Sequence, residues 1–186
     1  MNIKIIIQSV YYILDNNIKP LDKLSILKLI FFADRYHLRK YSRMITNDTY
    51  YAMKYGPVAS NVKNILDFDF IGDDEKNYVE LYLKKEDKLF EINSSFDHLD
   101  MLSNTDKEAL DFSIDNFGHH KTFDLVEITH KYPEWKRFEV SLEDGLTREK
   151  IIMEDFFEDT DIENDPFNCI SHEIVDLSRN FYFFKD

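Results

Sequence analysis

Apolar side chains recur at helical spacing at the start of the chain, at Ile3, Ile6, Ile7, Val10, Ile13 and Leu14. This spacing predicts an amphipathic helix that ends before Pro20. A second helix is predicted from Asp22, a suitable N-cap, to about Lys40. Its apolar stripe comprises Leu24, Leu27, Phe31, Leu38 and Tyr41. We expect the two helices to pack as a helical hairpin.

The middle of the chain alternates between extended and helical signals. Residues 43–55 are rich in Thr, Tyr and Ile, which indicates extended backbone. Gly56-Pro57 then interrupts the pattern, and Pro57 suits the first turn of a helix that reaches about Phe68. Residues 72–77 indicate a loop, after which segments 78–83 and 88–92 flank a polar turn at 84–87. This arrangement predicts a β-hairpin.

Helical signals dominate the second half. Thr105-Asp106-Lys107-Glu108 is typical of a capping box and opens a helix that should end at Gly118. Thr122 is expected to cap a short helix to His130, which Pro133 stops, and further helices are predicted near 147–158 and 171–182. The absence of an internal repeat or linker indicates one α+β domain over residues 1–186, predominantly α-helical with a small antiparallel β-hairpin or sheet.

Composition excludes several classes of protein. Hydrophobic residues make up 44% of the chain and aromatics 15%, which is too apolar for a disordered protein. The four glycines, at 56, 72, 118 and 145, are too far apart for a P-loop or a dinucleotide-binding turn. The apolar N-terminal stretch is shorter than the roughly 20 residues of a membrane helix, so no membrane partner is expected. Cys169 is the single cysteine, which fits a reducing cytoplasm.

Charge is distributed unevenly along the chain. The net charge is −13, with nine bases and four acids in residues 1–60 and fourteen bases and thirty-two acids in the remainder. An acidic chain repels nucleic-acid phosphates and favours a basic protein partner. The basic stretch 35–43 has two interpretations, contact with nucleic acid or neutralisation of the acidic half of the same chain, and the overall charge favours the second.

An acidic, aromatic segment lies near the C-terminus. Residues 151–178 contain nine acids and no Lys or Arg. We predict that two phenylalanines anchor a basic partner while the surrounding carboxylates steer it; the alternative is a solvated helix end followed by a loop. The predicted partner-binding residues are Asp155, Phe156, Phe157, Glu158, Asp159 and Asp161.

The histidines and carboxylates assemble no recognisable catalytic or metal motif. His119 and His120 are sequence neighbours, and no HxxxH or HExxH pair occurs, so no metal site is predicted. Asp34 and His37 lie one helical turn apart and could form an acid/base pair. The structural alternative is a buried Asp34 paired with Lys28, Arg35 or Lys54. No catalytic, cofactor-binding or metal-ligating residue is assigned.

Three ordered motifs carry a family resemblance. They are Leu27 to Leu38 (LKLIFFADRYHL), Ala52 to Val58 (AMKYGPV) and Thr129 to Trp135 (THKYPEW). Together they resemble the Panacea domain, also called the SocA-like antitoxin family, over about residues 1–138; residues 139–186 form an acidic, helical extension. Glu134 departs from the family pattern because it separates Pro133 from Trp135. The motif residues, interpreted as scaffold, are Lys28, Phe31, Ala33, Asp34, Lys54, Tyr55, Gly56, Pro57, Val58, His130 and Trp135.

The resemblance implies a bacterial or phage-borne antitoxin that neutralises a toxin encoded beside it, usually by direct protein contact. It also implies a largely helical fold, no enzymatic reaction and no cofactor. Together with the charge, it leads us to expect a cytoplasmic protein whose partner is a toxin with a basic surface. A proteolytic adaptor and a nucleic-acid-binding regulator are the alternatives.

Overall fold

A computed structural model describes residues 2–69 and 72–184. These residues form nine α-helices and two small antiparallel sheets of three strands each. The structure therefore confirms the predicted α+β class with a helical majority.

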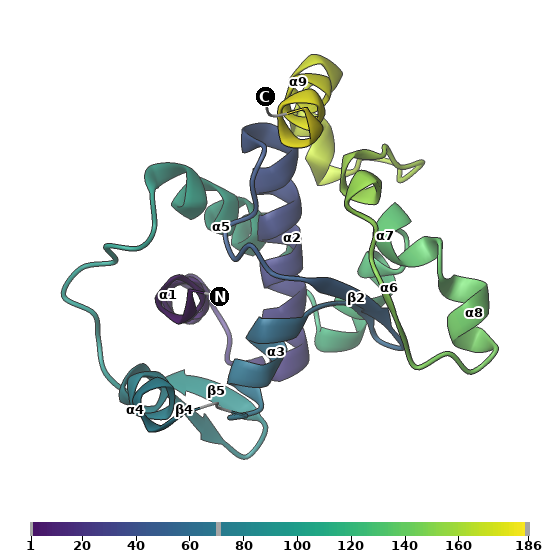
Figure 1. The fold of residues 1–186 in the computed structure, drawn as a ribbon. Helices are drawn as coiled ribbons and strands as arrows, with labels where there is room; N and C mark the ends of the chain where they lie inside the picture. Colours follow the sequence, from purple (N-terminus) through teal and green to yellow (C-terminus); the bar gives the residue numbers. More distant parts are fainter. Residues whose placement is uncertain (1, 70–71, 185–186) are drawn as a thin grey trace.

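Helix α2 (Lys23–Tyr41) is the centre of the fold, and every residue from Ser25 to Arg39 is buried. The Asp22 side chain caps it, as predicted, by accepting a hydrogen bond from the Ser25 N–H at 2.7 Å. Figure 1 shows α1 (Ile3–Asn16) end-on beside a nearly upright α2, so the two helices cross and do not form the expected hairpin. Because α2 is buried on all sides, several elements pack around it, and the most extensive contact is with α5 (Asn104–Phe117).

The first sheet has the strand order β1 (Leu21–Asp22), β5 (Leu89–Ile92), β4 (Leu83–Glu86). It contains a hairpin whose second strand lies where predicted, but its first strand is Leu83–Glu86, most of which was expected as the turn. Residues 73–82, expected as loop and strand, form helix α4 (Asp73–Tyr82). Three acids in its first turn favour a helix, because they complement the positive N-terminal end of the helix dipole. Tyr78 and Tyr82 also lie one turn apart, with ring centroids 5.2 Å from each other.

The second sheet has the order β3 (Gly56–Ala59), β2 (Tyr50–Met53), β6 (Arg148–Lys150). Pro57 therefore lies in a strand, and the helix predicted to begin there begins at Ser60 (α3, Ser60–Leu66). A proline is tolerated at this position because β3 is an edge strand. The helix predicted over 147–158 is also wrong, since β6 pairs with β2 and a 3-10 helix, η1 (Met153–Phe157), follows.

Most remaining helices match their predicted positions. Helix α5 is capped two residues earlier than expected, by a box of Ser103 and Asp106. Helices α6 (Thr122–Thr129) and α9 (His172–Phe183) lie where the pattern places them. Pro133 begins a short helix, α7 (Pro133–Lys136), which α8 (Glu139–Glu143) and later η2 (Pro166–Cys169) follow.

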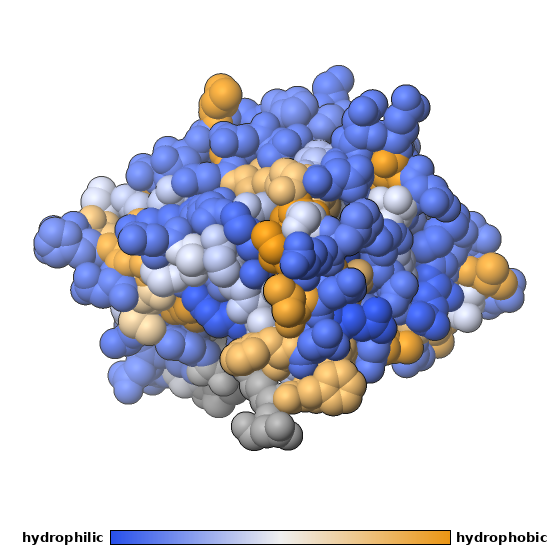
Figure 2. Space-filling model, turned by 90° about the horizontal axis from the view of Figure 1, so that it is seen from above, coloured by the Kyte–Doolittle hydropathy of each residue, from blue (hydrophilic) through white to orange (hydrophobic). Residues whose placement is uncertain are grey.

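The hydrophobic core is rich in aromatic rings and includes the C-terminal segment. Phe32 stacks on Phe117 with centroids 3.8 Å apart, and Phe156 lies 5.8 Å from Phe31 and 5.4 Å from Tyr50. Helix α9 packs on the C-terminal half of α2 and on η1, and it lies uppermost in Figure 1. Figure 2 looks down on that end of the molecule and shows apolar side chains in a band across a mostly polar face.

No helix in the described part of the chain combines the length and the apolar character needed to cross a membrane.

Candidate functional site

The three sequence motifs meet at one junction between α2, the β2–β3 turn and the α6–α7 corner. Lys28 Nζ of α2 donates to the Pro57 carbonyl at 2.9 Å. Trp135 Nε1 of α7 donates to the Met53 carbonyl at 2.8 Å. Segments far apart in the sequence are thus joined by side chains that bind the backbone of a single turn.

Gly56 permits this close approach. Its φ is +96°, in the region that side-chain-bearing residues rarely adopt. A Cβ at this position would lie 2.5 Å from Thr129 Oγ1 and 2.7 Å from Lys28 Nζ. The glycine is therefore required by the backbone conformation and also by the packing of two motif side chains against it.

Lys28 is a fully buried cation at this junction. Burial lowers the pKa of its ammonium from 10.5 to about 7, because removal from water disfavours the charged form. The hydrogen bond to Pro57 holds the amine beside the turn. Lys28 thus holds the β2–β3 turn against α2, and its contribution to the free energy of unfolding depends on pH.

We predict that Lys28→Met flattens the pH dependence of stability. The unfolded chain keeps Lys28 protonated up to its ordinary pKa of 10.5, whereas the folded chain releases this proton near pH 7. The unfolded state therefore binds more protons between these values, so the contribution of Lys28 to stability rises with pH by up to about 1.4 kcal/mol per pH unit. Urea denaturation between about pH 7 and pH 9.5 measures the difference.

A matched variant, Lys88→Met, removes an exposed lysine and leaves the burial of Lys28 intact. It should retain the wild-type slope. A stability difference between wild type and Lys28→Met that is independent of pH would contradict the proposed titration of Lys28.

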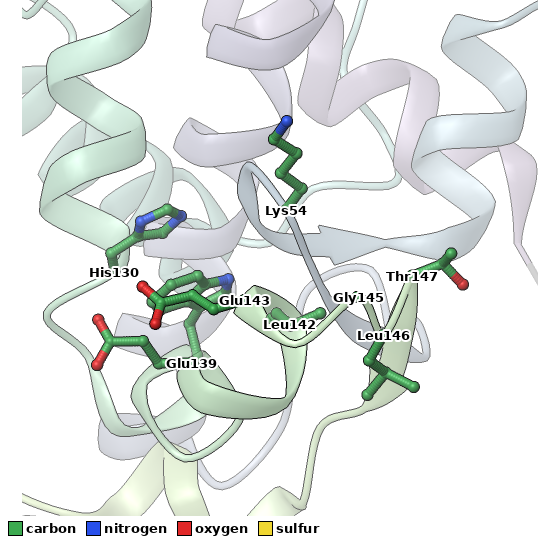
Figure 3. A pocket seen from close by; sticks show the side chains of 9 residues that line it. Lys54, His130, Glu139, Leu142, Glu143, Gly145, Leu146 and Thr147 are labelled. Carbon is green, nitrogen blue, oxygen red and sulfur yellow. The ribbon is translucent and has the colours of Figure 1, made fainter.

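A pocket of about 650 Å³ opens beside the junction. It is lined by Lys54, His130, Trp135, Glu139, Leu142, Glu143, Gly145, Leu146 and Thr147. Figure 3 shows both glutamates on the His130 side, while the Lys54 side chain extends away from them. The imidazole of His130 lies flat on the Trp135 ring, with centroids 3.5 Å apart. Burial, assisted by the charge of Lys28, lowers the pKa of His130 to about 4, so the ring is neutral at pH 7.

Asp34 and His37 do not form the acid/base pair that their spacing would allow. Asp34 accepts hydrogen bonds from the backbone of Ile45 and Thr46, at 2.7 and 3.0 Å, and from the Tyr50 hydroxyl at 2.8 Å. Its partners are N–H and O–H groups, which corrects the expected pairing with Lys28, Arg35 or Lys54. Burial raises the pKa of Asp34 to about 6, although these hydrogen bonds oppose the shift. The carboxylate organises the start of the extended segment and is not exposed to a substrate.

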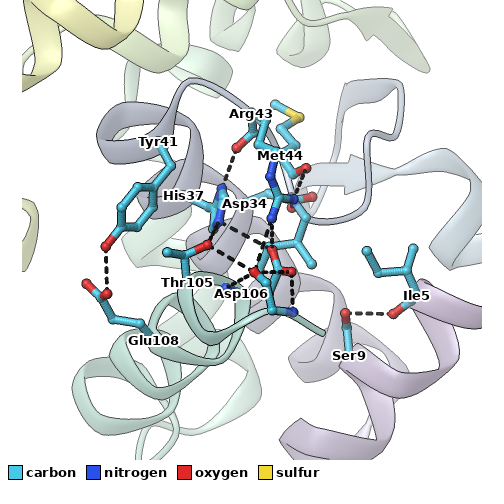
Figure 4. A network of polar contacts seen from close by, with 12 residues as sticks. Ile5, Ser9, Asp34, His37, Tyr41, Arg43, Met44, Thr105, Asp106 and Glu108 are labelled. Atoms are coloured by element: carbon cyan, nitrogen blue, oxygen red, sulfur yellow. Dashed lines mark hydrogen bonds and ion pairs between the residues drawn. The ribbon is translucent and has the colours of Figure 1, made fainter. Parts of the chain in front are cut away.

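His37 belongs to a separate network between α2 and α5, shown in Figure 4. Its Nδ1 lies 2.8 Å from the Arg43 carbonyl oxygen and its Nε2 lies 3.0 Å from Thr105 Oγ1. Arg43 in turn pairs with Asp106 at 2.7 Å. Burial lowers the pKa of His37, so the imidazole serves as a neutral hydrogen-bonding group at pH 7.

The other cations of the basic stretch also have partners within the chain. Lys40 pairs with Glu108 at 2.6 Å, and Arg39 pairs with Asp159 at 2.9 Å. These contacts support the interpretation that the stretch neutralises acidic residues of the same chain.

Arg35 and Glu134 form a buried ion pair that the sequence did not predict. Neither side chain is more than 1% exposed. Arg35 also donates to the carbonyls of Phe156 and Glu158, both at 3.0 Å, so it ties α2 to α7 and to the C-terminal segment. Two signals could have revealed the pair. One is an arginine beside an apolar helix stripe, and the other is a glutamate inserted into the family signature.

The predicted partner-binding segment divides into buried and exposed residues. Phe156 and Phe157 are only 0% and 4% exposed, so the structure corrects the expectation that they are available to anchor a partner. Asp155 is also buried and forms two hydrogen bonds to Arg137, at 2.7 and 2.6 Å. Glu158, Asp159 and Asp161 are exposed, and their role in partner binding remains a prediction. The fold brings the two phenylalanines next to the core, and the hydrophobic effect favours burial of their rings there.

Among the residues described, no group of three or more His, Cys, Asp or Glu side chains is placed to hold a metal ion.

The fold is a helical core in which one motif-bearing junction and one buried ion pair join distant segments. The sequence model of the antitoxin SocA-like, Panacea domain family matches residues 26–136, and the chain belongs to this family. The matched range contains all three motifs of the junction, whereas η1 and α9 lie outside it. No protein of curated function and no solved structure matches the chain.

Proposed function

We propose that this protein is a cytoplasmic antitoxin that binds a toxin directly and thereby neutralises it. Membership of the SocA-like antitoxin family carries the proposal. Asp34 and His37, the two residues considered for acid/base chemistry, serve two separate structural networks. The motif residues around Gly56 hold the scaffold together, so the toxin contacts are expected on other surfaces.

The charge of the chain favours a basic toxin surface. The protein carries a net charge of −13, and the C-terminal segment exposes Glu158, Asp159, Asp161 and Glu163. Complementary charge accelerates encounter and disfavours wrong partners. We propose that the acidic surface covers the region with which the toxin recognises its own substrate.

Co-expression with the product of the adjacent reading frame tests the proposal. We expect the neighbour to arrest growth when expressed alone, and this chain to restore growth and to co-purify with it. Rescue accompanied by faster loss of the toxin would instead favour an adaptor that delivers it to a protease. A harmless neighbour, or rescue with no stable complex, would contradict direct neutralisation.

The affinity for the toxin should fall as salt increases from about 0.05 to about 0.5 M, because ions screen exposed charges. Replacing Asp161 with Asn and Glu163 with Gln should remove part of this dependence. Each lost surface pair costs about 0.2–1 kcal/mol, which corresponds to a rise in Kd of about two- to thirtyfold for the two together. Isothermal titration calorimetry at several salt concentrations measures both effects.

The control is Asp97→Asn with Asp100→Asn, in the segment between β5 and α5. It changes the net charge equally at two other exposed positions. The control should bind as the wild type does. Equal weakening by both pairs would indicate an effect of net charge alone, and an affinity insensitive to salt would refute charge-based recognition.

A further inference from the structure

Helix α9 carries an apolar stripe on its outer side. Ile174, Leu177, Phe181 and Phe184 follow one another at intervals of three, four and three residues. Their exposed fractions are 38%, 63%, 63% and 75%. This spacing places the first three on one face of the helix, and Phe184 follows directly at its C-cap. Figure 2, which looks onto this end of the molecule, shows apolar side chains gathered among polar ones.

The opposite face of α9 is held by the rest of the fold. Val175 and Ser178 are buried, and the Ser42 hydroxyl at the end of α2 donates to the Ser178 carbonyl at 2.8 Å. The Tyr182 ring lies 5.9 Å from the ring of Phe157. The helix thus has two apolar faces, one packed against the core and the other directed outward. A helix fixed in this way presents its outer stripe on a backbone that is already ordered before binding.

Carboxylates lie on α9 and in the segment that follows η1. Glu173 and Asp176 are exposed on α9 itself, and Glu158 and Asp159 follow η1 beside it. Arg179 lies 3.5 Å from Glu158 and Arg39 lies 2.9 Å from Asp159, so these two carboxylates are partly neutralised within the chain. Glu173 and Asp176 therefore contribute most of the negative charge beside the stripe. An apolar contact area whose rim carries a net negative charge suits a partner of the opposite sign.

We propose that the outer stripe of α9 is the principal docking surface for the toxin, and that it inserts into an apolar groove bordered by Lys and Arg. This inference rests on the proposed function and specifies the partner surface. A second copy of the chain fits less well, because dimerisation through α9 would bring two carboxylate rims together. The stripe lies beyond residues 26–136, so recognition of the toxin is separate from the motifs that hold the family scaffold.

Binding of the co-expressed toxin by three forms of the full chain tests the inference. The stripe variant combines Leu177→Gln and Phe184→Gln, which remove apolar surface without adding charge. The control combines Phe123→Gln and Val140→Gln, at two other apolar side chains that are 65% and 68% exposed. The stripe variant should raise Kd by about tenfold or more and keep the wild-type melting temperature, whereas the control should bind normally.

Each result is decisive. Normal toxin binding by the stripe variant would overturn the docking surface and leave the antitoxin proposal intact. Failure of the wild type to bind the toxin would overturn the proposed function and this inference with it. A concentration-dependent dimer of the wild type in sedimentation, lost in the stripe variant, would assign the stripe to a second copy and refute the proposal.

Discussion

Glu134→Leu should lower the free energy of unfolding by about 3–5 kcal/mol, because it leaves the Arg35 guanidinium buried without its counter-charge. Arg35 and Glu134 are no more than 1% exposed, so water cannot replace the missing carboxylate. Burial raises the pKa of Glu134, and the charge of Arg35 opposes this shift. For a chain of this size the melting temperature should fall by about 6–20 °C.

The double variant Arg35→Met with Glu134→Leu should recover most of this loss. Replacing both charges removes two desolvation costs, and well-packed apolar pairs of similar volume often match a buried ion pair in stability. Arg39 still donates to the Phe156 and Glu158 carbonyls, at 3.2 and 3.0 Å, so these acceptors keep a partner. Urea denaturation of the wild type, both single variants and the double variant gives the coupling energy of the pair.

The exposed pair Lys136–Glu139 provides the control. Its side chains are 59% and 31% exposed, and Glu139→Leu should cost less than about 1 kcal/mol. If Glu134→Leu were as mild as Glu139→Leu, the buried pair would not have the structural role assigned to it.

Gly56→Ala should destabilise the protein by about 3 kcal/mol. A non-glycine residue at this φ costs about 1–3 kcal/mol, and a tightly packed Cβ adds a comparable amount. The new methyl group would lie 2.5 Å from Thr129 Oγ1 and 2.7 Å from Lys28 Nζ, so the contact between α2, α6 and the β2–β3 turn must open. Thermal and urea unfolding measure the loss.

Gly145→Ala separates the two contributions. Gly145 also has a positive φ, of +104°, but a Cβ there would meet nothing within 4 Å. Gly145→Ala should therefore lose only the free energy that the unfavourable φ costs. The additional loss of unfolding free energy in Gly56→Ala then measures the cost of the steric contact. Equal losses at the two glycines would mean that the close packing around Gly56 contributes nothing.

Much of the helical framework could be predicted because helix signals are local. The apolar spacing of α1, the Asp22 cap of α2 and the polar start of α5 act within a few residues. The motifs also identified the family, which the match over residues 26–136 shows. Short strands were harder to predict from the sequence. Pro57, for example, suits both the start of a helix and an edge strand, and only pairing with a partner strand decides between the two.

The sequence by itself determined the helical pattern, the acidic charge and the family. Only the tertiary structure decided which charged and aromatic residues are buried. Phe156 and Phe157 lie in an acidic segment that resembles an exposed surface, yet they fill the core, while Leu177 and Phe181 on a regular helix remain exposed. Glu134 forms an ion pair with Arg35, and Gly56 packs against Lys28, although each pair is far apart in the sequence. Burial depends on which segments the fold brings together, and residue type and local spacing do not contain that information.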